Sequence, residues 1–207
     1  MALTRKPHGP PVAHPERKYT RDRAGLLAQL EDADPVARRW AARDLSDCPE
    51  ASAALVARLQ READLSVREV ILTTLTVVGD DVAVAGLVAC LRSEDVALRN
   101  EAIEAMKQLP KKVAAIMGGL LDDPNPDVRI FAVNVLESLR HPEVEAWLIA
   151  VIERDAHLNV CATAVDLLGE VGTATARAPL LRLKARFASE PYIQFAADLA
   201  LKRLAGA

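Results

Sequence analysis

A helix-opening pattern recurs about every 30 residues along most of this chain, and it limits the possible folds more than any other feature. Its clearest copy is the stretch 122–139, DDPNPDVRIFAVNVLESL, in which an Asp/Pro/Asn turn precedes an amphipathic helix. The arginine position of the pattern is occupied, in chain order, by Arg38, Arg68, Arg99, Arg129, Cys161 and Gln194. Successive copies are 30 to 33 residues apart, so the chain is predicted to consist of repeated structural units.

Each unit is predicted to be a pair of antiparallel helices. The first helix carries leucines at helical spacing, and the second carries small residues such as Ala102 and Ala132 toward its neighbour. Proline and glycine, as at Pro110 and Gly79, separate the units because they end helices. The predicted first helices lie near 23–32, 50–62, 81–92, 111–121, 142–154 and 174–188. The predicted second helices lie near 35–46, 65–78, 96–108, 126–139, 157–170 and 190–204.

The composition agrees with an all-α fold. Apolar residues make up 51% of the chain and aromatic residues only 3%, and a core of Ala, Leu, Val and Ile suits packed helices. The net charge of −3 gives no general attraction to nucleic acid or to an anionic membrane. The longest apolar run, 82–91, is far shorter than the about 20 residues that span a bilayer. Three widely spaced cysteines indicate a reducing compartment. We therefore expect a cytoplasmic protein without membrane association.

The turn acid and the following Val-Arg, as in Asp127-Val128-Arg129, resemble the HEAT-repeat family, specifically the short bacterial HEAT-like repeats also found in phycobilisome lyase subunits. The resemblance covers residues 24–205. It implies a right-handed α-solenoid of about six stacked helix pairs whose second helices line a concave face. It also implies a hydrogen-bonded ladder between units, made by Asp34, Arg38, Asp64, Arg68, Asp95, Arg99, Asp127 and Arg129, with Asp123 as the alternative to Asp127. Cys161 and Gln194 cannot continue this ladder, so it is expected to weaken in the last two units.

The N-terminal segment differs from the repeats. Residues 1–23 contain six basic and two acidic residues, a net charge of +4, which leaves −7 for the rest of the chain. This segment is also rich in proline and lacks apolar periodicity. We predict a flexible basic arm over residues 1–22 and a repeat domain over residues 23–207.

If the second helices line the concave face, the residues that follow each arginine position point into it. The predicted partner-binding residues are Arg39, Trp40, Arg43, Glu69, Val70, Thr73, Asn100, Glu101, Glu104, Ile130, Phe131, Asn134 and Phe195. Aromatic side chains here would be apolar anchors, and the glutamates would select a basic partner segment. The alternative is that Trp40 and Phe131 pack between units and that the glutamates belong to a solvated helix face.

No catalytic or metal-binding motif accompanies the repeats. None of the four histidines belongs to a group of three converging ligands such as a metal site needs, so neither a metal nor another cofactor is expected. Gly118-Gly119 lacks the Lys-Ser/Thr of a phosphate-binding loop, and we interpret the pair as permitting close helix packing. The chain is therefore predicted not to be an enzyme.

These features favour a non-enzymatic protein-interaction module, a scaffold or adaptor that holds a partner in its concave groove. The family resemblance implies an alternative, a subunit of a bilin or tetrapyrrole lyase or of a cofactor-maturation chaperone. Nucleic-acid binding is a minor alternative. It rests on Arg38, Arg39, Trp40 and Arg43, which share one helix, but the acidic neighbouring units would repel a phosphate backbone.

Overall fold

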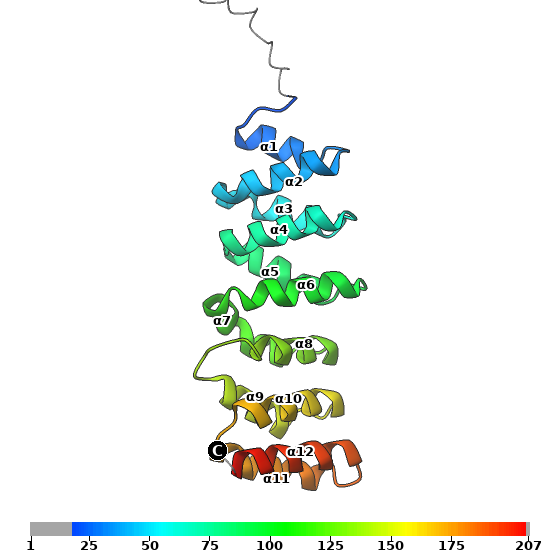
Figure 1. Cartoon of the computed structure of the whole chain (residues 1–207), viewed down its shortest axis with the longest axis vertical. Coiled ribbons are helices and arrows are strands. Elements are labelled where there is room, and N and C mark those ends of the chain that lie inside the picture. The colour runs from blue at the N-terminus through cyan, green and yellow to red at the C-terminus, as the bar shows by residue number, and fades with distance from the viewer. Residues whose placement is uncertain (1–17, 206–207) are drawn as a thin grey trace, which may run out of the picture.

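The computed structural model describes residues 18–205, and these residues form helices stacked along one long axis (Figure 1). The described range contains twelve α-helices and three short 3-10 helices, and no strand occurs within it. The chain runs through the stack in order, from α1 at the top to α12 at the bottom, so helix pairs that follow each other in sequence lie side by side (Figure 1). The predicted all-α solenoid is confirmed.

The twelve α-helices alternate between two positions in the stack. The first helices of the pairs are α1 (Arg23–Gln29), α3 (Ser52–Leu59), α5 (Asp81–Cys90), α7 (Pro110–Leu121), α9 (Val144–Arg154) and α11 (Arg177–Arg186). The second helices are α2 (Pro35–Asp44), α4 (Leu65–Val78), α6 (Val96–Lys107), α8 (Pro126–Leu136), α10 (Leu158–Val171) and α12 (Pro191–Ala205). The sequence periodicity placed all twelve within a few residues. The differences are confined to helix ends, where 3-10 turns such as Ala174–Ala176 replace the predicted first turn.

The second helices of the first four units begin at a residue whose side chain caps the helix. The capping residues are Asp34, Asp64, Asp95 and Asn125. Each side-chain oxygen accepts a hydrogen bond from the backbone N–H two residues later, at 2.9 Å in all four cases. Such a cap satisfies an N–H that has no partner inside the helix and contributes about 1 kcal/mol. The repeated turn acid therefore has a local role in starting each second helix.

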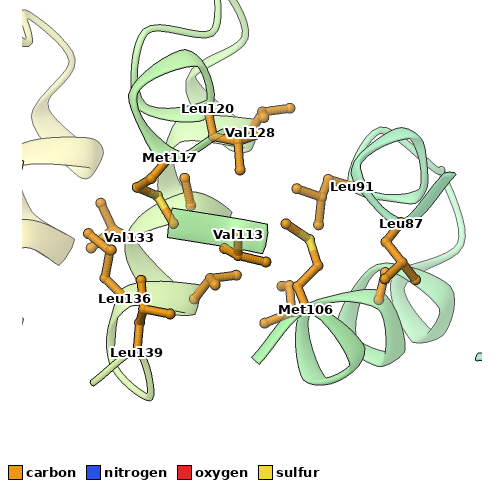
Figure 2. Close-up of a cluster of buried hydrophobic side chains, with 14 of the residues drawn as sticks. Leu87, Leu91, Met106, Val113, Met117, Leu120, Val128, Val133, Leu136 and Leu139 are labelled. Atoms are coloured by element: carbon orange, nitrogen blue, oxygen red, sulfur yellow. The ribbon is translucent and has the colours of Figure 1, made fainter. Parts of the chain in front are cut away.

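The core runs continuously through the stack. In the middle units, Val113, Met117 and Leu120 of α7 point toward Val128 of α8 and Met106 of α6 (Figure 2). Small residues let successive second helices pack closely, and Ala102, Ala132, Ala164 and Ala197 have no exposed surface. Because every apolar helix face is covered partly by a neighbouring unit, the stability of each unit depends on the next.

Residues 18–22 lie against the turn between α1 and α2. Lys18 Nζ and Tyr19 Oη both donate hydrogen bonds to the carboxylate of Asp32. The remainder of the predicted basic arm, residues 1–17, lies outside the described residues, as do residues 206–207. From residue 18 to residue 205, no helix combines the length and the apolar character needed to cross a bilayer.

Candidate partner-binding groove

The first helix-pair junction is held by a buried ion pair. Arg38 on α2 donates from Nε and Nη2 to the two carboxylate oxygens of Glu62, each at 2.8 Å. Its Nη1 donates to the backbone carbonyls of Asp32 and Ala33 at 2.9 and 2.8 Å. Glu62 is only 1% exposed and lies in the turn before α4. One guanidinium group therefore ties the turn of its own unit to the turn of the next unit with bidentate geometry.

Glu62 is ionised in this buried position because donors surround it. Burial by itself raises the pKa of this carboxyl. The hydrogen bonds from Arg38, from Arg58 and from the backbone N–H of Asp64 outweigh burial and lower the pKa to about 2. The charge of Glu62 is thus fully compensated inside the molecule.

The arginines of the next three units vary this arrangement. Arg68 donates to the carbonyl of Glu62 at 2.6 Å and pairs with Asp95 of the next unit at 2.7 Å. Arg129 donates to Asp155 Oδ2 and Oδ1 at 2.6 and 3.0 Å. Arg99 differs, because it donates to the carbonyl of Ser93 and lies over the ring of Phe131, with 5.7 Å from its Cζ to the centroid. Among the described residues, Arg99 forms no ion pair.

The structure corrects three of the acids that the resemblance assigned to this ladder, Asp34, Asp64 and Asp127, whereas Asp95 does pair with the arginine of the preceding unit. Asp34 and Asp64 use their carboxylates to cap their own helices, and Asp127 is exposed in the first turn of α8. Glu62 and Asp155, which receive the arginines, each lie two residues before a capping position. Asp95 differs from these residues, because its carboxylate caps α6 and also pairs with Arg68 of the preceding unit. Asp123 instead pairs with Arg92 at the end of the preceding first helix.

At Cys161, where the repeat has no arginine, other side chains connect the neighbouring units. Cys161 Sγ donates to the carbonyl of Asp155 at 3.3 Å, in place of an arginine. Arg186, at the end of α11, enters the same junction and donates to the carbonyls of Ile152, Glu153 and Asp155 at 2.6 to 2.8 Å. It also contacts Cys161 Sγ at 3.3 Å. Sequence alignment missed Arg186 because it lies on a first helix, outside the aligned column.

A groove of about 560 Å³ lies between α4 and α6, which are two successive second helices. Its lining residues are Leu65, Glu69, Leu72, Thr73, Thr76, Asn100, Glu101, Glu104, Ala105 and Gln108. Leu72 and Ala105 are buried and form the apolar floor, and Leu65 is 62% exposed at one end. The groove therefore brings together five of the predicted partner-binding residues, namely Glu69, Thr73, Asn100, Glu101 and Glu104.

Glu101 is the least satisfied acid of this groove. Its Oε2 atom is buried and has no hydrogen-bond partner within the described residues. Burial raises the pKa of Glu101, and the nearby carboxylates of Asp95 and Glu69 raise it further, against the lowering effect of Arg68. Glu104 forms an ion pair with Lys107 at 2.9 Å, whereas Glu69 has none among the described residues. The groove thus contains two carboxylates, those of Glu69 and Glu101, that form no ion pair within the described residues.

A second acidic groove occupies the equivalent place between α8 and α10. It is lined by Val133, Asn134, Glu137, Thr163, Asp166, Leu167 and Glu170. Of the predicted residues it contains Asn134, and the tyrosine hydroxyl of Tyr192 donates to Asp166 at 3.0 Å. Sequence reasoning did not select Glu137 and Glu170, although the repeat register could have found them, because they lie about two helical turns after the arginine position.

The predicted apolar anchors divide into exposed and packed residues. Trp40 is 46% exposed, and the guanidinium group of Arg43 lies 4.4 Å from its ring centroid. Phe195 is 68% exposed on α12. Val70, Ile130 and Phe131 are half-buried and pack against the core. Arg39 is half-buried on α2 and, together with Trp40 and Arg43, lies outside the α4–α6 groove.

No group of three or more metal-ligating side chains occurs between residues 18 and 205.

The family model of HEAT repeats matches residues 23–107 and 113–202. No curated protein matches the chain. Solved structures similar to it include the archaeal HEAT-like repeats protein from Thermococcus onnurineus, at 18% identity and a TM-score of 0.46, covering 89% of this chain and 88% of that chain.

Two further solved structures are similar at the same low identity. A designed armadillo repeat protein is 18% identical with a TM-score of 0.39, covering 86% of this chain and 98% of that chain. The complex of CpcE and CpcF of phycocyanin lyase from Nostoc is 18% identical with a TM-score of 0.38, covering 99% of this chain and 100% of that chain. The family model spans most of the described helices, and the chain therefore belongs to the HEAT-repeat family.

Proposed function

We propose that this protein is a non-enzymatic interaction module that binds an extended basic segment of a partner protein along the grooves between its second helices. One observation carries the proposal. The acids at the junctions are paired with arginines inside the chain, whereas Glu69 and Glu101 line an open groove without an ion-pair partner among the described residues. Glu69 is exposed and Glu101 is partly withdrawn from water, and unpaired carboxylates of this kind are suited to a cation supplied from outside.

The groove also suits the shape of a basic side chain. A lysine or arginine could place its charged head in the groove beside Glu69 and Glu101 while its aliphatic stem packs on Leu65 and Leu72. The equivalent groove at Glu137 and Glu170 would receive a second basic residue further along the same partner segment. An extended partner that spans several units follows from the repeated spacing of these grooves.

A defined peptide tests this proposal. The probe is a fluorescent peptide of alternating lysine and leucine, its matched control alternates glutamate and leucine, and binding is followed by anisotropy. We expect the basic peptide alone to bind, with an affinity that falls as salt rises, because ions screen charges beyond a Debye length of about 10 Å at 0.1 M.

The site is tested with the double substitution Glu101→Lys and Glu104→Lys. We expect it to raise the dissociation constant at least about tenfold, equivalent to about 1.4 kcal/mol. The matched control is Glu94→Lys with Glu143→Lys, which changes the net charge equally at two exposed positions outside the groove. Equal losses in both double variants would mean that net charge alone attracts the peptide, and unchanged binding in the groove variant would exclude the groove.

A further inference from the structure

The outer face of α7 contains two glycines that the folded chain does not explain. Gly118 and Gly119 are exposed, and a Cβ atom added at either position would meet nothing within 4 Å. Neither has a positive φ, which among the described residues occurs only at Gly79. A glycine inside a helix costs about 1 kcal/mol relative to alanine. The close packing that the sequence suggested for this pair is therefore not made within the described chain.

Gly118 belongs to a stripe of four exposed residues along α7, Lys111, Ala115, Gly118 and Asp122. Their spacing of four, three and four residues places them on one side of the helix. The core residues Val113, Met117 and Leu120 point the other way, into the stack (Figure 2). The stripe thus forms the outermost ridge of α7.

The surface beside this ridge is apolar. A groove between α5 and α7 is lined mainly by Val84, Ala85, Val88, Ala115, Ile116 and Gly119. On α5, Val82 is 49% exposed, and Ala85 and Ala89 are exposed as well. A helix that is apolar on all sides is usually buried, and α5 carries no charged residue after Asp81. This face of the stack therefore offers an uncovered apolar surface.

The unpaired charges at the two ends of the stripe favour a second copy of this chain as the partner. Lys112 pairs with Asp81 at 2.8 Å, and Asp123 pairs with Arg92, so these neighbours are neutralised within the chain. Lys111 and Asp122, at opposite ends of the stripe, have no ion-pair partner within residues 18–205. When the order Lys, Ala, Gly, Asp is laid against a reversed copy of itself, each charged residue faces one of opposite charge and each small residue faces a small one. An antiparallel copy of α7 would place Lys111 opposite Asp122 and Ala115 opposite Gly118.

We propose that two copies of this chain form a twofold-symmetric dimer in which α7 packs antiparallel against α7 of the second copy. A twofold interface uses the same surface on both subunits, which is what this self-complementary stripe provides. Gly118 allows the two backbones to approach closely, because no side chain stands between them. Each dimer contains two equivalent Lys111–Asp122 pairs, and the exposed apolar residues of α5 lie beside the contact.

Charge reversal tests the dimer by sedimentation equilibrium. Lys111→Asp alone and Asp122→Lys alone each place like charges opposite each other twice, so each is expected to raise the dimer dissociation constant at least about tenfold. The double variant Lys111→Asp with Asp122→Lys restores opposite charges with the signs exchanged, and we expect it to dimerise again. A wild-type chain that stays monomeric at all concentrations, or a double variant as weak as the single ones, would overturn the proposal.

A steric variant separates dimerisation from folding. Gly118→Leu adds a side chain that meets open space in the single chain but fills the proposed contact. We expect a monomer whose helical circular dichroism and melting temperature, compared at a concentration below the wild-type dimer dissociation constant, are not lowered, since dimerisation adds no stability there and leucine favours the helix over glycine. A Gly118→Leu variant that dimerises as tightly as the wild type would contradict the α7 contact. The α4–α6 groove lies on second helices, so peptide binding should persist in this monomer.

Discussion

Glu62 and Glu101 are both withdrawn from solvent, yet their surroundings are opposite. Glu62, at the first junction, accepts hydrogen bonds from two arginines and a backbone N–H, and its pKa is lowered to about 2. Glu101, in the α4–α6 groove, has a buried oxygen without a partner among the described residues, and its pKa is raised by burial and by nearby acids. The first carboxylate stabilises the fold when charged, whereas the second destabilises it when charged.

This difference separates the stack into a structural region and a candidate binding region. At the junctions, cations and anions satisfy each other within the chain, as Arg38 does with Glu62 and Arg129 with Asp155. In the α4–α6 groove, Glu69 and Glu101 have no such partner among the described residues. A surface that is less stable than it could be is typical of a site selected for binding rather than for folding.

The largest effect is expected from Glu62→Ala. The substitution leaves the buried Arg38 without a carboxylate partner and removes the nearer of the two partners of the half-buried Arg58, and breaking a buried pair in this way costs about 3–5 kcal/mol. The free energy of unfolding in urea measures the loss. As a control, Glu94→Ala at an exposed turn position should stay within about 0.5 kcal/mol of the wild type. A loss for Glu62→Ala as small as that of the control would mean that the junction ion pair contributes little.

Stability should also fall in acid because of Glu62. Its pKa in the folded chain is about 2, against 4.5 for the unperturbed group. Because the folded value is the lower one, the contribution is complete above about pH 4.5 and is lost as the pH falls toward 2. The shift corresponds to about 3 kcal/mol.

The matched comparison for this prediction is Glu62→Gln, which cannot ionise. The difference in unfolding free energy between the wild type and Glu62→Gln should be large at pH 7 and should shrink between about pH 4.5 and 2. A difference that does not change with pH would show that the charge of Glu62 is not what stabilises the junction.

The junction at Cys161 gives a smaller and more specific effect. Arg186→Ala removes the guanidinium group that donates to Ile152, Glu153 and Asp155, and we expect a loss of about 2 kcal/mol. In that background, Cys161→Arg should restore part of the stability, because it returns an arginine to the repeat position. In the wild type the same substitution should destabilise, since two guanidinium groups would compete for one junction. Additive effects would contradict a shared role, and we expect a coupling energy of at least about 1 kcal/mol.

The smallest junction effect is expected at Arg99. This arginine has a carbonyl partner and the ring of Phe131 but no ion pair among the described residues. Arg99→Ala should therefore lower the free energy of unfolding by about 1 kcal/mol, less than Arg38→Ala does. Equal losses in urea unfolding would mean that the carboxylate partner of Arg38 adds nothing.

The sequence contained enough information for the helices but not for all their contacts. Turn acids and prolines such as Asp34 and Pro126 act locally, so the helix starts could be read from their spacing. The repeated arginines could also be identified from the sequence, because they follow each helix start at a regular spacing. The carboxylates that Arg38 and Arg129 bind were not identified, although Glu62 and Asp155 each lie six residues before the repeat position of their own unit, because spacing does not show which acid of a turn faces the preceding unit.

The candidate groove could be predicted only in part. Glu69, Glu101 and Glu104 were found because successive second helices repeat the same face. Phe131 shares that register but packs against the core, since the space beside each helix depends on the side chains of its neighbours. The role of Arg186 could not be predicted, because Arg186 lies on α11, far from Cys161 in the sequence.

The most direct test compares the same change, carboxylate to amide, at the two glutamates. Urea unfolding at pH 7 should show Glu62→Gln destabilised by about 2–3 kcal/mol, because the amide cannot neutralise Arg38 and Arg58. Glu101→Gln should be unchanged or stabilised by up to about 1 kcal/mol, because it removes a partly buried charge that has no ion-pair partner among the described residues. Destabilisation of both variants by similar amounts would contradict the division between junction acids that hold the stack and groove acids that are left for a partner.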